Sequence, residues 1–179
     1  YMNTSVRVKA MTGAQGGAVC ISSNVRQIVQ WAREKGKKIL FIPDQLMGEN
    51  VADWLGIKKL AYWPVGTAGA HYCLPDQSAQ TLKTFDDAEM VLFSSLCAVH
   101  AHYHASMCTY WKAQGFCVIA HPECPNEVIR VADHSGSTAF IWDRVMQDRD
   151  HTRRYAIATE NHLVQNLKEQ AGLQGIKVV

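Results

Sequence analysis

The chain of 179 residues has 47% hydrophobic and 19% charged residues and a formal net charge of +2, proportions that exclude an intrinsically disordered protein. Acidic and basic residues are interleaved without a basic stripe or an acidic tail, so we expect no nucleic acid partner. No apolar run approaches the roughly 18 residues of a membrane span and no signal peptide is recognisable, which predicts a soluble, cytoplasmic protein without a membrane partner.

Short apolar segments alternate with amphipathic segments along the chain, which predicts an α/β protein with parallel sheets. Tyr1 reads as the end of a strand, so we expect the sequence to begin inside a longer protein. The predicted strands cover residues 38–42, 60–63, 89–93, 116–120, 155–158 and 176–179, and the predicted helices cover residues 24–34, 49–55, 103–114, 126–132, 138–146 and 162–170. The fold class that we expect is α/β, with two similar three-layer units in which helices flank a parallel sheet.

Small and polar residues precede the first of these helices. Gly13, Gly16 and Gly17 predict a flexible loop, but they lack the spacing of a nucleotide-binding motif. Ser22 lies just before the helix, whose N-terminal dipole favours anions, although capping alone would explain the hydroxyls and the amide at this position.

The stretch from Pro64 to Gln77 contains two prolines and two glycines without periodicity. Such a composition predicts a long loop between two α/β units. We therefore divide the chain into residues 1–95 and residues 96–179.

Polar side chains follow several of the predicted strands. Asp44, His100, His121 and Glu160 each come shortly after a strand end. Ligands of open α/β sheets bind beyond the carboxyl ends of the strands, so these positions are candidates for a site.

Six cysteines in a chain without a secretory signal predict reduced thiols or metal ligands, and most of them are expected to be buried as small hydrophobic side chains. Cys97, His100, His102, His104 and Cys108 concentrate metal ligands within twelve positions. His104 and Cys108 would share one face of a helix, as in zinc sites. The alternative is an exposed turn that carries the histidines and a core position for Cys108.

The residues His121, Pro122 and Glu123 place an imidazole and a carboxylate directly after a buried strand, in a turn stiffened by proline. A desolvated carboxylate can act as general base, and a neighbouring histidine can donate or relay the proton. The alternative is that Glu123 merely starts the following helix.

A second helix start follows at Gly136, Ser137 and Thr138. Its backbone N–H groups and two hydroxyls suit a carboxylate or a phosphate. Ordinary N-capping by Ser137 explains the same residues.

The ordered set of these motifs resembles quinolinate synthase. The resemblance rests on Tyr1-Met2-Asn3-Thr4-Ser5, Gly16-Gly17-Ala18-Val19-Cys20-Ile21-Ser22-Ser23-Asn24, Phe41-Ile42-Pro43-Asp44-Gln45, Cys97-Ala98-Val99-His100, His121-Pro122-Glu123-Cys124-Pro125, Gly136-Ser137-Thr138 and Thr159-Glu160. It implies three similar α/β domains around a 4Fe-4S cluster, which is held by one cysteine per domain and acts as Lewis acid. It also implies the condensation of iminoaspartate with dihydroxyacetone phosphate to quinolinate, in NAD biosynthesis.

Through this resemblance, individual residues acquire expected roles. Cys97 is the expected cluster ligand, and two further cysteine ligands are expected outside this chain. The expected catalytic residues are Glu123 as general base, His121, His100 and Tyr1. The expected substrate-binding residues are Tyr1, Met2, Asn3, Ser22, His121, Pro122, Glu123, Ser137 and Thr138.

Parts of the family pattern are absent from the sequence. The two units resemble the second and third domains, whereas the first domain and a cluster cysteine expected beyond Val179 are missing, so we expect the isolated segment to be inactive. Ala158 stands where the family pattern leads us to expect glycine. Two alternatives remain: a zinc-dependent hydrolase using Cys97, His100, His104 and Cys108 with Glu123 as base, and a non-catalytic module that binds a dicarboxylate. The sequence predicts no oligomeric state.

Overall fold

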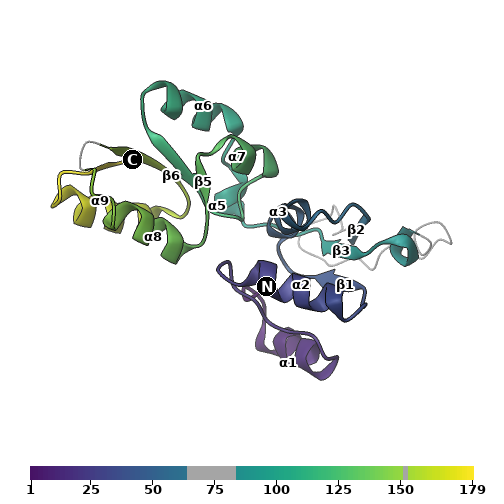
Figure 1. The fold of residues 1–179 in the computed structure, drawn as a ribbon. Helices are drawn as coiled ribbons and strands as arrows, with labels where there is room; N and C mark the ends of the chain where they lie inside the picture. The colour runs from purple at the N-terminus through teal and green to yellow at the C-terminus, as the bar shows by residue number, and fades with distance from the viewer. Residues whose placement is uncertain (64–83, 151–152) are drawn as a thin grey trace. The chain divides into compact units, whose positions relative to one another are not determined.

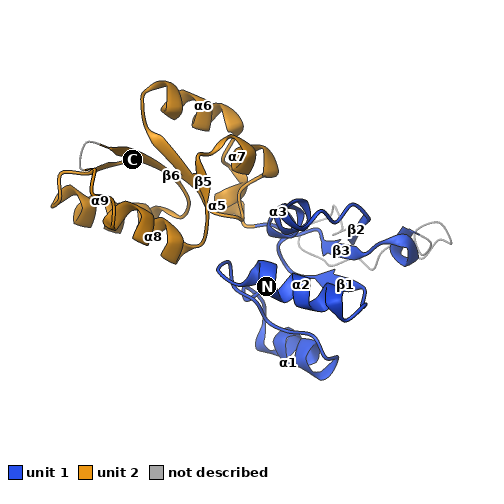
Figure 2. Cartoon of the chain, viewed as in Figure 1, with its two compact units in different colours: residues 1–96 blue, residues 97–179 orange. Residues whose placement is uncertain are grey.

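The computed structural model describes residues 1–63, 84–150 and 153–179 and divides the chain into two compact units, Tyr1–Leu96 and Cys97–Val179 (Figures 1 and 2). The predicted loop from Pro64 to Gln77, with Cys73, lies outside the described residues. Both units are built from parallel strands and helices, which confirms the predicted α/β class.

The first unit contains a three-stranded parallel sheet in the order β1-β3-β2. Its elements are α1 (Val6–Ala14), α2 (Val25–Glu34), β1 (Ile39–Phe41), α3 (Gln45–Leu55), β2 (Leu60–Trp63) and β3 (Met90–Phe93). Ile39 and Phe41 of β1 point to one face of the sheet, where they join one buried cluster with Val29 of α2 and Met47 of α3. Because side chains alternate between the two faces of a strand, the positions of the apolar residues in β1 determine which face of this sheet the helices cover.

Close packing of α3 against the sheet depends on Gly48. A Cβ atom at this position would lie 2.5 Å from Cδ2 of Leu92 and 3.0 Å from Cδ1 of Phe41. Because carbon atoms in contact lie about 3.5–4.0 Å apart, only glycine lets the helix approach the sheet this closely. The helix begins four residues before the predicted start at Glu49, since the Asp44 side chain accepts a hydrogen bond of 2.7 Å from the N–H of Met47.

Two expectations for the N-terminal segment were wrong. Gly13 lies inside helix α1 rather than in a loop, and Tyr1 is outside the strands that the structure describes. The Ser5 side chain caps this helix by accepting a hydrogen bond from the N–H of Val8 (3.3 Å). It contains no buried residue, so its sequence shows no apolar face from which it could have been predicted.

The second unit contains a four-stranded parallel sheet in the order β5-β4-β6-β7. Its elements are α5 (Ala98–Ala101), α6 (Ala105–Ala113), β4 (Cys117–Ala120), α7 (Asn126–Val131), β5 (His134–Ser135), α8 (Thr138–Met146), β6 (Arg154–Ala158), α9 (Asn161–Gly172) and β7 (Lys177–Val178). The short elements α5 and β5 were not predicted, whereas α8 has the predicted bounds.

The sheet of the second unit is covered by helices on both faces. Ile119 and Ile157 belong to a buried cluster with residues of α8 and α9. Val118 and Ala156, one position away along each strand, belong to another cluster with Cys108 of α6 and residues of α7. Successive side chains of a strand point to opposite faces, so this unit has the three layers that the continuous apolar strands predicted.

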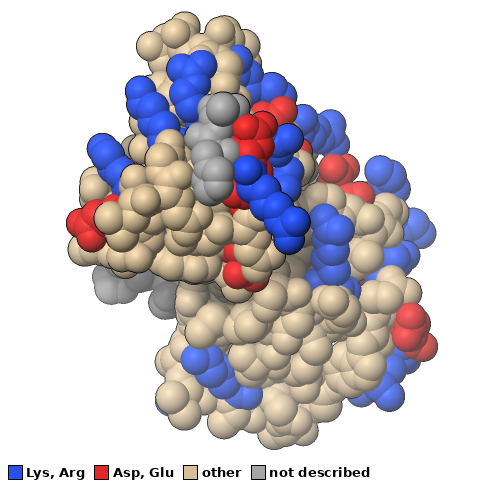
Figure 3. Space-filling view, turned by 60° about the vertical axis from the view of Figure 1, so that its left-hand side comes forward, with Lys and Arg blue, Asp and Glu red and all other residues tan. Residues whose placement is uncertain are grey.

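The described surface carries both signs of charge. In the face shown in Figure 3, Lys and Arg side chains are interspersed with Asp and Glu side chains and with uncharged residues. Among the described residues, no helix is both long enough and apolar enough to cross a membrane.

Candidate active site

The turn that follows β4 is buried at the carboxyl end of the strand. The N–H of His121 donates to the carbonyl of Ala158 at the end of β6 (3.0 Å), and the N–H of Cys124 donates back to the carbonyl of His121 (2.9 Å). His121, Pro122 and Glu123 are all buried. Two neighbouring parallel strands thus fix this turn at the edge of the sheet where α/β proteins bind ligands.

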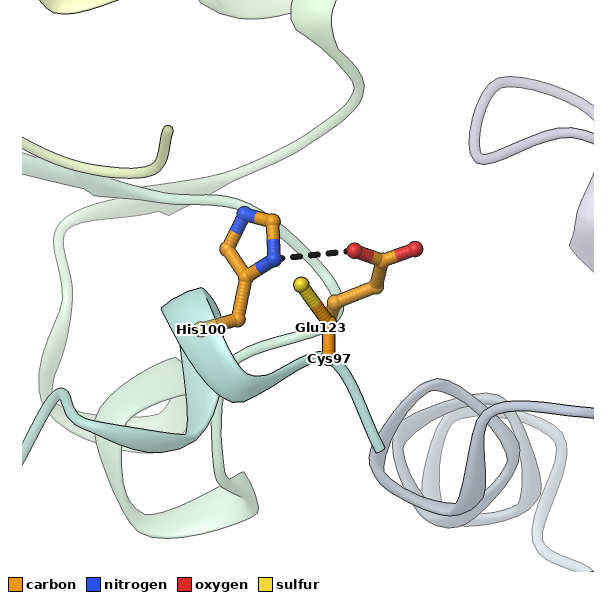
Figure 4. A group of neighbouring side chains, drawn as sticks. All are labelled: Cys97, His100 and Glu123. Carbon is orange, nitrogen blue, oxygen red and sulfur yellow. Dashed lines mark ion pairs between the residues drawn. The ribbon is translucent and has the colours of Figure 1, made fainter. Parts of the chain in front are cut away.

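Helix α5 brings two further side chains to the turn. Cys97 is the N-cap of this single helical turn and His100 lies three residues later, so both side chains lie on one side of it. Nδ1 of His100 lies 2.8 Å from Oε2 of Glu123, and the ligand atoms of Cys97, His100 and Glu123 all lie within 4.8 Å of one another (Figure 4). The structure therefore brings together three of the predicted site residues, from two separate elements of the second unit.

The His100 ring is fixed from its other edge. Nε2 of His100 lies 3.2 Å from Oγ1 of Thr159, and both residues are buried. The hydroxyl of Tyr103 in turn donates to the carbonyl of Thr159 (2.6 Å). No role was predicted for Thr159 or Tyr103 from the sequence, although Thr159 directly follows a predicted strand, which is the signal that could have identified it.

His121 packs against this pair. Its ring stacks on the ring of His100 with centroids 4.7 Å apart, and its Nδ1 accepts from the N–H of Glu123 (3.4 Å). Burial and, secondarily, the nearby His100 lower the pKa of His121 to about 4, against the opposing effect of Glu123. His121 is therefore neutral at pH 7, and because Nδ1 accepts a hydrogen bond, its proton resides on Nε2.

The second predicted helix start, at Ser137 and Thr138, is the N-terminus of α8. Ser137 is the buried N-cap of α8 and accepts from the N–H of Phe140 (3.3 Å), while Thr138 is exposed at the first helical position. Glu160 caps α9 in the same way, by accepting from the N–H groups of His162 and Leu163. Capping explains Ser137 and Glu160 structurally and leaves Thr138 available at the N-terminus of α8.

The predicted binding residues of the first unit lie close to one another. The N–H of Met2 donates to the carbonyl of Cys20 (2.9 Å), which sets Met2 and its neighbours beside the segment that leads to Ser22. The amino group of Tyr1 donates to the carbonyl of Ile42 (2.5 Å). Met2 and Asn3 are exposed, whereas Tyr1 and Ser22 are half-buried.

The ligand set of the predicted zinc hydrolase does not assemble. His104 is exposed at the start of α6, and Cys108 is buried in the apolar core of the second unit. Within the described residues, neither side chain belongs to a group of three or more metal ligands. The five cysteines that the structure describes form no disulfide bonds with one another.

Comparison with known proteins shows to which family this chain belongs. The sequence model of the quinolinate synthetase A protein family matches residues 1–177. Quinolinate synthase of Corynebacterium glutamicum is 35% identical over 178 residues, which are 95% of this chain and 42% of that protein. Quinolinate synthase of Halobacterium salinarum is 37% identical over 171 residues, which are 94% of this chain and 43% of that protein. Quinolinate synthase of Streptomyces coelicolor is 34% identical over 185 residues, which cover 100% of this chain and 44% of that protein. The chain thus spans less than half the length of these relatives, and it belongs to the quinolinate synthetase A protein family.

Proposed function

We propose that this chain is part of a cytoplasmic quinolinate synthase, which condenses iminoaspartate with dihydroxyacetone phosphate to quinolinate in NAD biosynthesis. Its two units would be the second and third domains of a pseudo-symmetric enzyme with three domains. The observation that carries the proposal is the buried carboxylate of Glu123 between a cysteine and two histidines, at the carboxyl edge of a parallel sheet. Since the chain spans 42% of its relative from Corynebacterium glutamicum, we expect no activity from the chain alone.

The donor set of the second unit fits one corner of a 4Fe-4S cluster. Cys97 is partly exposed, so its thiol is accessible to a cluster. Cys124 is buried and hydrogen-bonds the carbonyl of Ala158, and burial raises its pKa to about 12, so it remains a protonated thiol. The other two ligands of the cluster are expected outside this chain. When bound, a cluster with one iron free of protein ligands supplies a Lewis acid to a substrate oxygen or nitrogen.

Glu123 has the position of a general base. The residue is 3% exposed and its Oε2 lies 2.8 Å from Nδ1 of His100, so a proton taken from the substrate stays within reach of a second group. Thr159 orients the His100 ring through Nε2. These contacts support the assignment of Glu123 and His100 to the proton transfers that accompany condensation and dehydration.

His121 is suited to donate a hydrogen bond. Neutral at pH 7 and with Nδ1 engaged by the N–H of Glu123, it carries a proton on Nε2. A neutral imidazole with this tautomer can polarise a carbonyl or protonate a leaving hydroxyl.

Each unit contains residues that we propose as partners of anionic groups of the substrates. Thr138 stands at the N-terminus of α8, where the helix dipole favours a carboxylate or a phosphate, with Ser137 holding the helix start. Tyr1, Met2, Asn3 and Ser22 of the first unit are the proposed partners of substrate carboxylates. Tyr1 is also the fourth proposed catalytic residue. Pro122 would hold the shape of the His121 turn.

The test uses the complete product of the gene that encodes this chain, expressed anaerobically and reconstituted with iron and sulfide. We expect the visible and EPR spectra of a 4Fe-4S cluster, and quinolinate from iminoaspartate and dihydroxyacetone phosphate. Cys97→Ala should prevent cluster assembly. Glu123→Gln should retain the cluster and lower the rate of quinolinate formation by at least ~100-fold, the typical contribution of a general base.

The outcomes separate the alternatives. Absence of a cluster in the complete product would refute the cluster-dependent enzyme. Full activity of Glu123→Gln would refute the assignment of the base. Binding of a dicarboxylate without any turnover, in a protein that holds no cluster, would support the non-catalytic module instead.

A further inference from the structure

We propose that the residues that precede Tyr1 in the complete gene product form a β-strand, which inserts into the first unit between β1 and residues 18–20. Only the first unit is involved, so this strand would form whether or not the protein has the proposed activity. Four features of the unit point to it: a cavity, two backbone hydrogen bonds, an open strand edge and a helix that buries no residue.

An apolar cavity of about 470 Å³ lies between α1, α2 and β1. Residues 37–42 line it on one side and residues 15–20 on another, and Tyr1 lines it as well. Protein interiors leave few voids larger than a water molecule, whose share of volume is about 30 Å³. A cavity of this size therefore calls for an occupant, which is either a ligand or a segment of protein.

Two backbone hydrogen bonds at this cavity have the pattern of a strand. The amino group of Tyr1 donates to the carbonyl of Ile42 (2.5 Å), whereas the N–H of the next residue, Met2, donates to the carbonyl of Cys20 (2.9 Å) (Figure 1). Successive N–H groups of a strand point to opposite sides, so these bonds are those of a strand with a neighbour on each side. In the complete product the Tyr1 nitrogen is a peptide N–H, which retains the one hydrogen that this bond needs.

Strand β1 has an open edge toward the cavity. Among the strands that the structure describes, β1 pairs only with β3. The N–H of Ile39 donates to the carbonyl of Glu89, next to β3 (3.0 Å), so the backbone groups of Leu40 and Ile42 point the other way. Both of these residues line the cavity. Natural proteins cover or block such edges, because their N–H and C=O groups pair readily with another strand.

Helix α1 lacks a surface to pack against. It has nine residues and none of them is buried, although isolated helices shorter than about 12–15 residues are marginal in water. Its residues Val8, Met11 and Thr12 line the cavity. A strand in the cavity would pair the edge of β1 and give α1 an apolar surface, whereas a small ligand would leave the edge unpaired.

The connections fix the direction and the register of the proposed strand. Helix α1 follows residues 1–3 and leads to residues 18–20, and α2 leads from there to β1, so the three segments run parallel. Continued backwards from Tyr1, the ladder bonds both the N–H of Ile42 and the carbonyl of Leu40 to the residue two positions before Tyr1. The residue three positions before Tyr1 then lies opposite Leu40. The chain spans 42% of its relative from Corynebacterium glutamicum, which leaves ample length for such a segment.

The test is a cross-link in the complete gene product, prepared without iron and sulfide. Leu40→Cys is combined with a cysteine three positions before Tyr1, and the protein is treated with dibromobimane, a short reagent that fluoresces when it bridges two thiols. Leu40 is 53% exposed, so this substitution should not unfold the protein. Neighbouring strands are about 4.8 Å apart, so we expect mass spectrometry to find the two engineered cysteines bridged. The matched control places the second cysteine two positions before Tyr1, where its side chain points to the opposite face, and should be bridged at least ~10-fold less. Equal bridging in the two proteins, or none in the first, would overturn the proposal.

Hydrogen exchange provides a second measurement without a variant. In the 179-residue chain the N–H of Leu40 should exchange faster than that of Phe41, whose backbone faces β3. In the complete product the exchange of Leu40 should be at least ~100-fold slower than in the chain. An unchanged rate for Leu40 would contradict the inserted strand. Protection of the chain alone that grows with its concentration would place a second copy at the edge, and protection of the complete product without the cross-link would place a different segment there; either result would also overturn the proposal.

Discussion

Replacing Gly136 with alanine tests how tightly the start of α8 is packed. A Cβ atom at this position would lie 2.2 Å from Cδ1, 2.4 Å from Cγ and 2.8 Å from Cβ of Phe140. The ring is 40% exposed and can turn outward, but the Cβ atom is fixed by the helix backbone, so the helix start itself must move. Overpacking of this kind costs about 1–3 kcal/mol.

The assay is urea unfolding followed by far-UV circular dichroism. With a slope of about 1–3 kcal/mol per molar urea, a loss of about 2 kcal/mol lowers the midpoint by roughly 1 M. In a Phe140→Ala background, Gly136→Ala should cost clearly less, because only the Cβ contact remains. Gly172→Ala is the matched control: at the last residue of α9 its Cβ would meet nothing within 4 Å, so the midpoint should not fall. An unchanged midpoint for Gly136→Ala, or no relief by Phe140→Ala, would refute the packing argument.

Three further predictions concern stability. Asp44→Ala should destabilise the first unit by about 1 kcal/mol by removing the cap of α3, and Asp44→Asn should restore most of the loss; equal unfolding midpoints for the two variants would contradict the cap. Leu167→Ala should cost about 2–5 kcal/mol, since Leu167 is fully buried against the sheet of the second unit, and a loss below 1 kcal/mol in calorimetry would show that the site collapses without strain. Burial and the hydrogen bond to Asp148 raise the pKa of Tyr155 from 10 to about 12, so the folded state binds the phenol proton more tightly than the unfolded state does. The resulting stabilisation of the folded state is complete below pH 10 and is lost as the pH rises to 12. Tyr155→Phe should therefore flatten the fall of the unfolding free energy measured across that range.

Much of the fold could be predicted because its strands are continuous apolar runs and most of its helices carry an apolar face. Each of these patterns is local, and it reports which side of an element is buried. Elements without such a pattern were missed. Helix α1 buries none of its residues, and α5 and β5 are only four and two residues long.

The candidate site was partly predictable for a topological reason. Parallel strands present their carboxyl ends at one edge of a sheet, so residues that follow them, such as His121, could be nominated from sequence. The sequence could not show which of these residues lie close together in the fold. Cys97 and Cys108 belong to one cluster of potential ligands in the sequence, yet the first lies beside Glu123 and the second in the apolar core.

The sequence by itself determined the α/β class, the order of the principal elements and the residue types gathered at the strand ends. Only the tertiary structure decided that His100 is held between Glu123 and Thr159. Its Nδ1 lies 2.8 Å from the Glu123 carboxylate, near the thiol of Cys97, and its Nε2 lies 3.2 Å from the hydroxyl of Thr159. The physical reason is that hydrophobic periodicity is written in neighbouring residues, whereas the distances and angles between polar side chains arise when separate elements pack against each other.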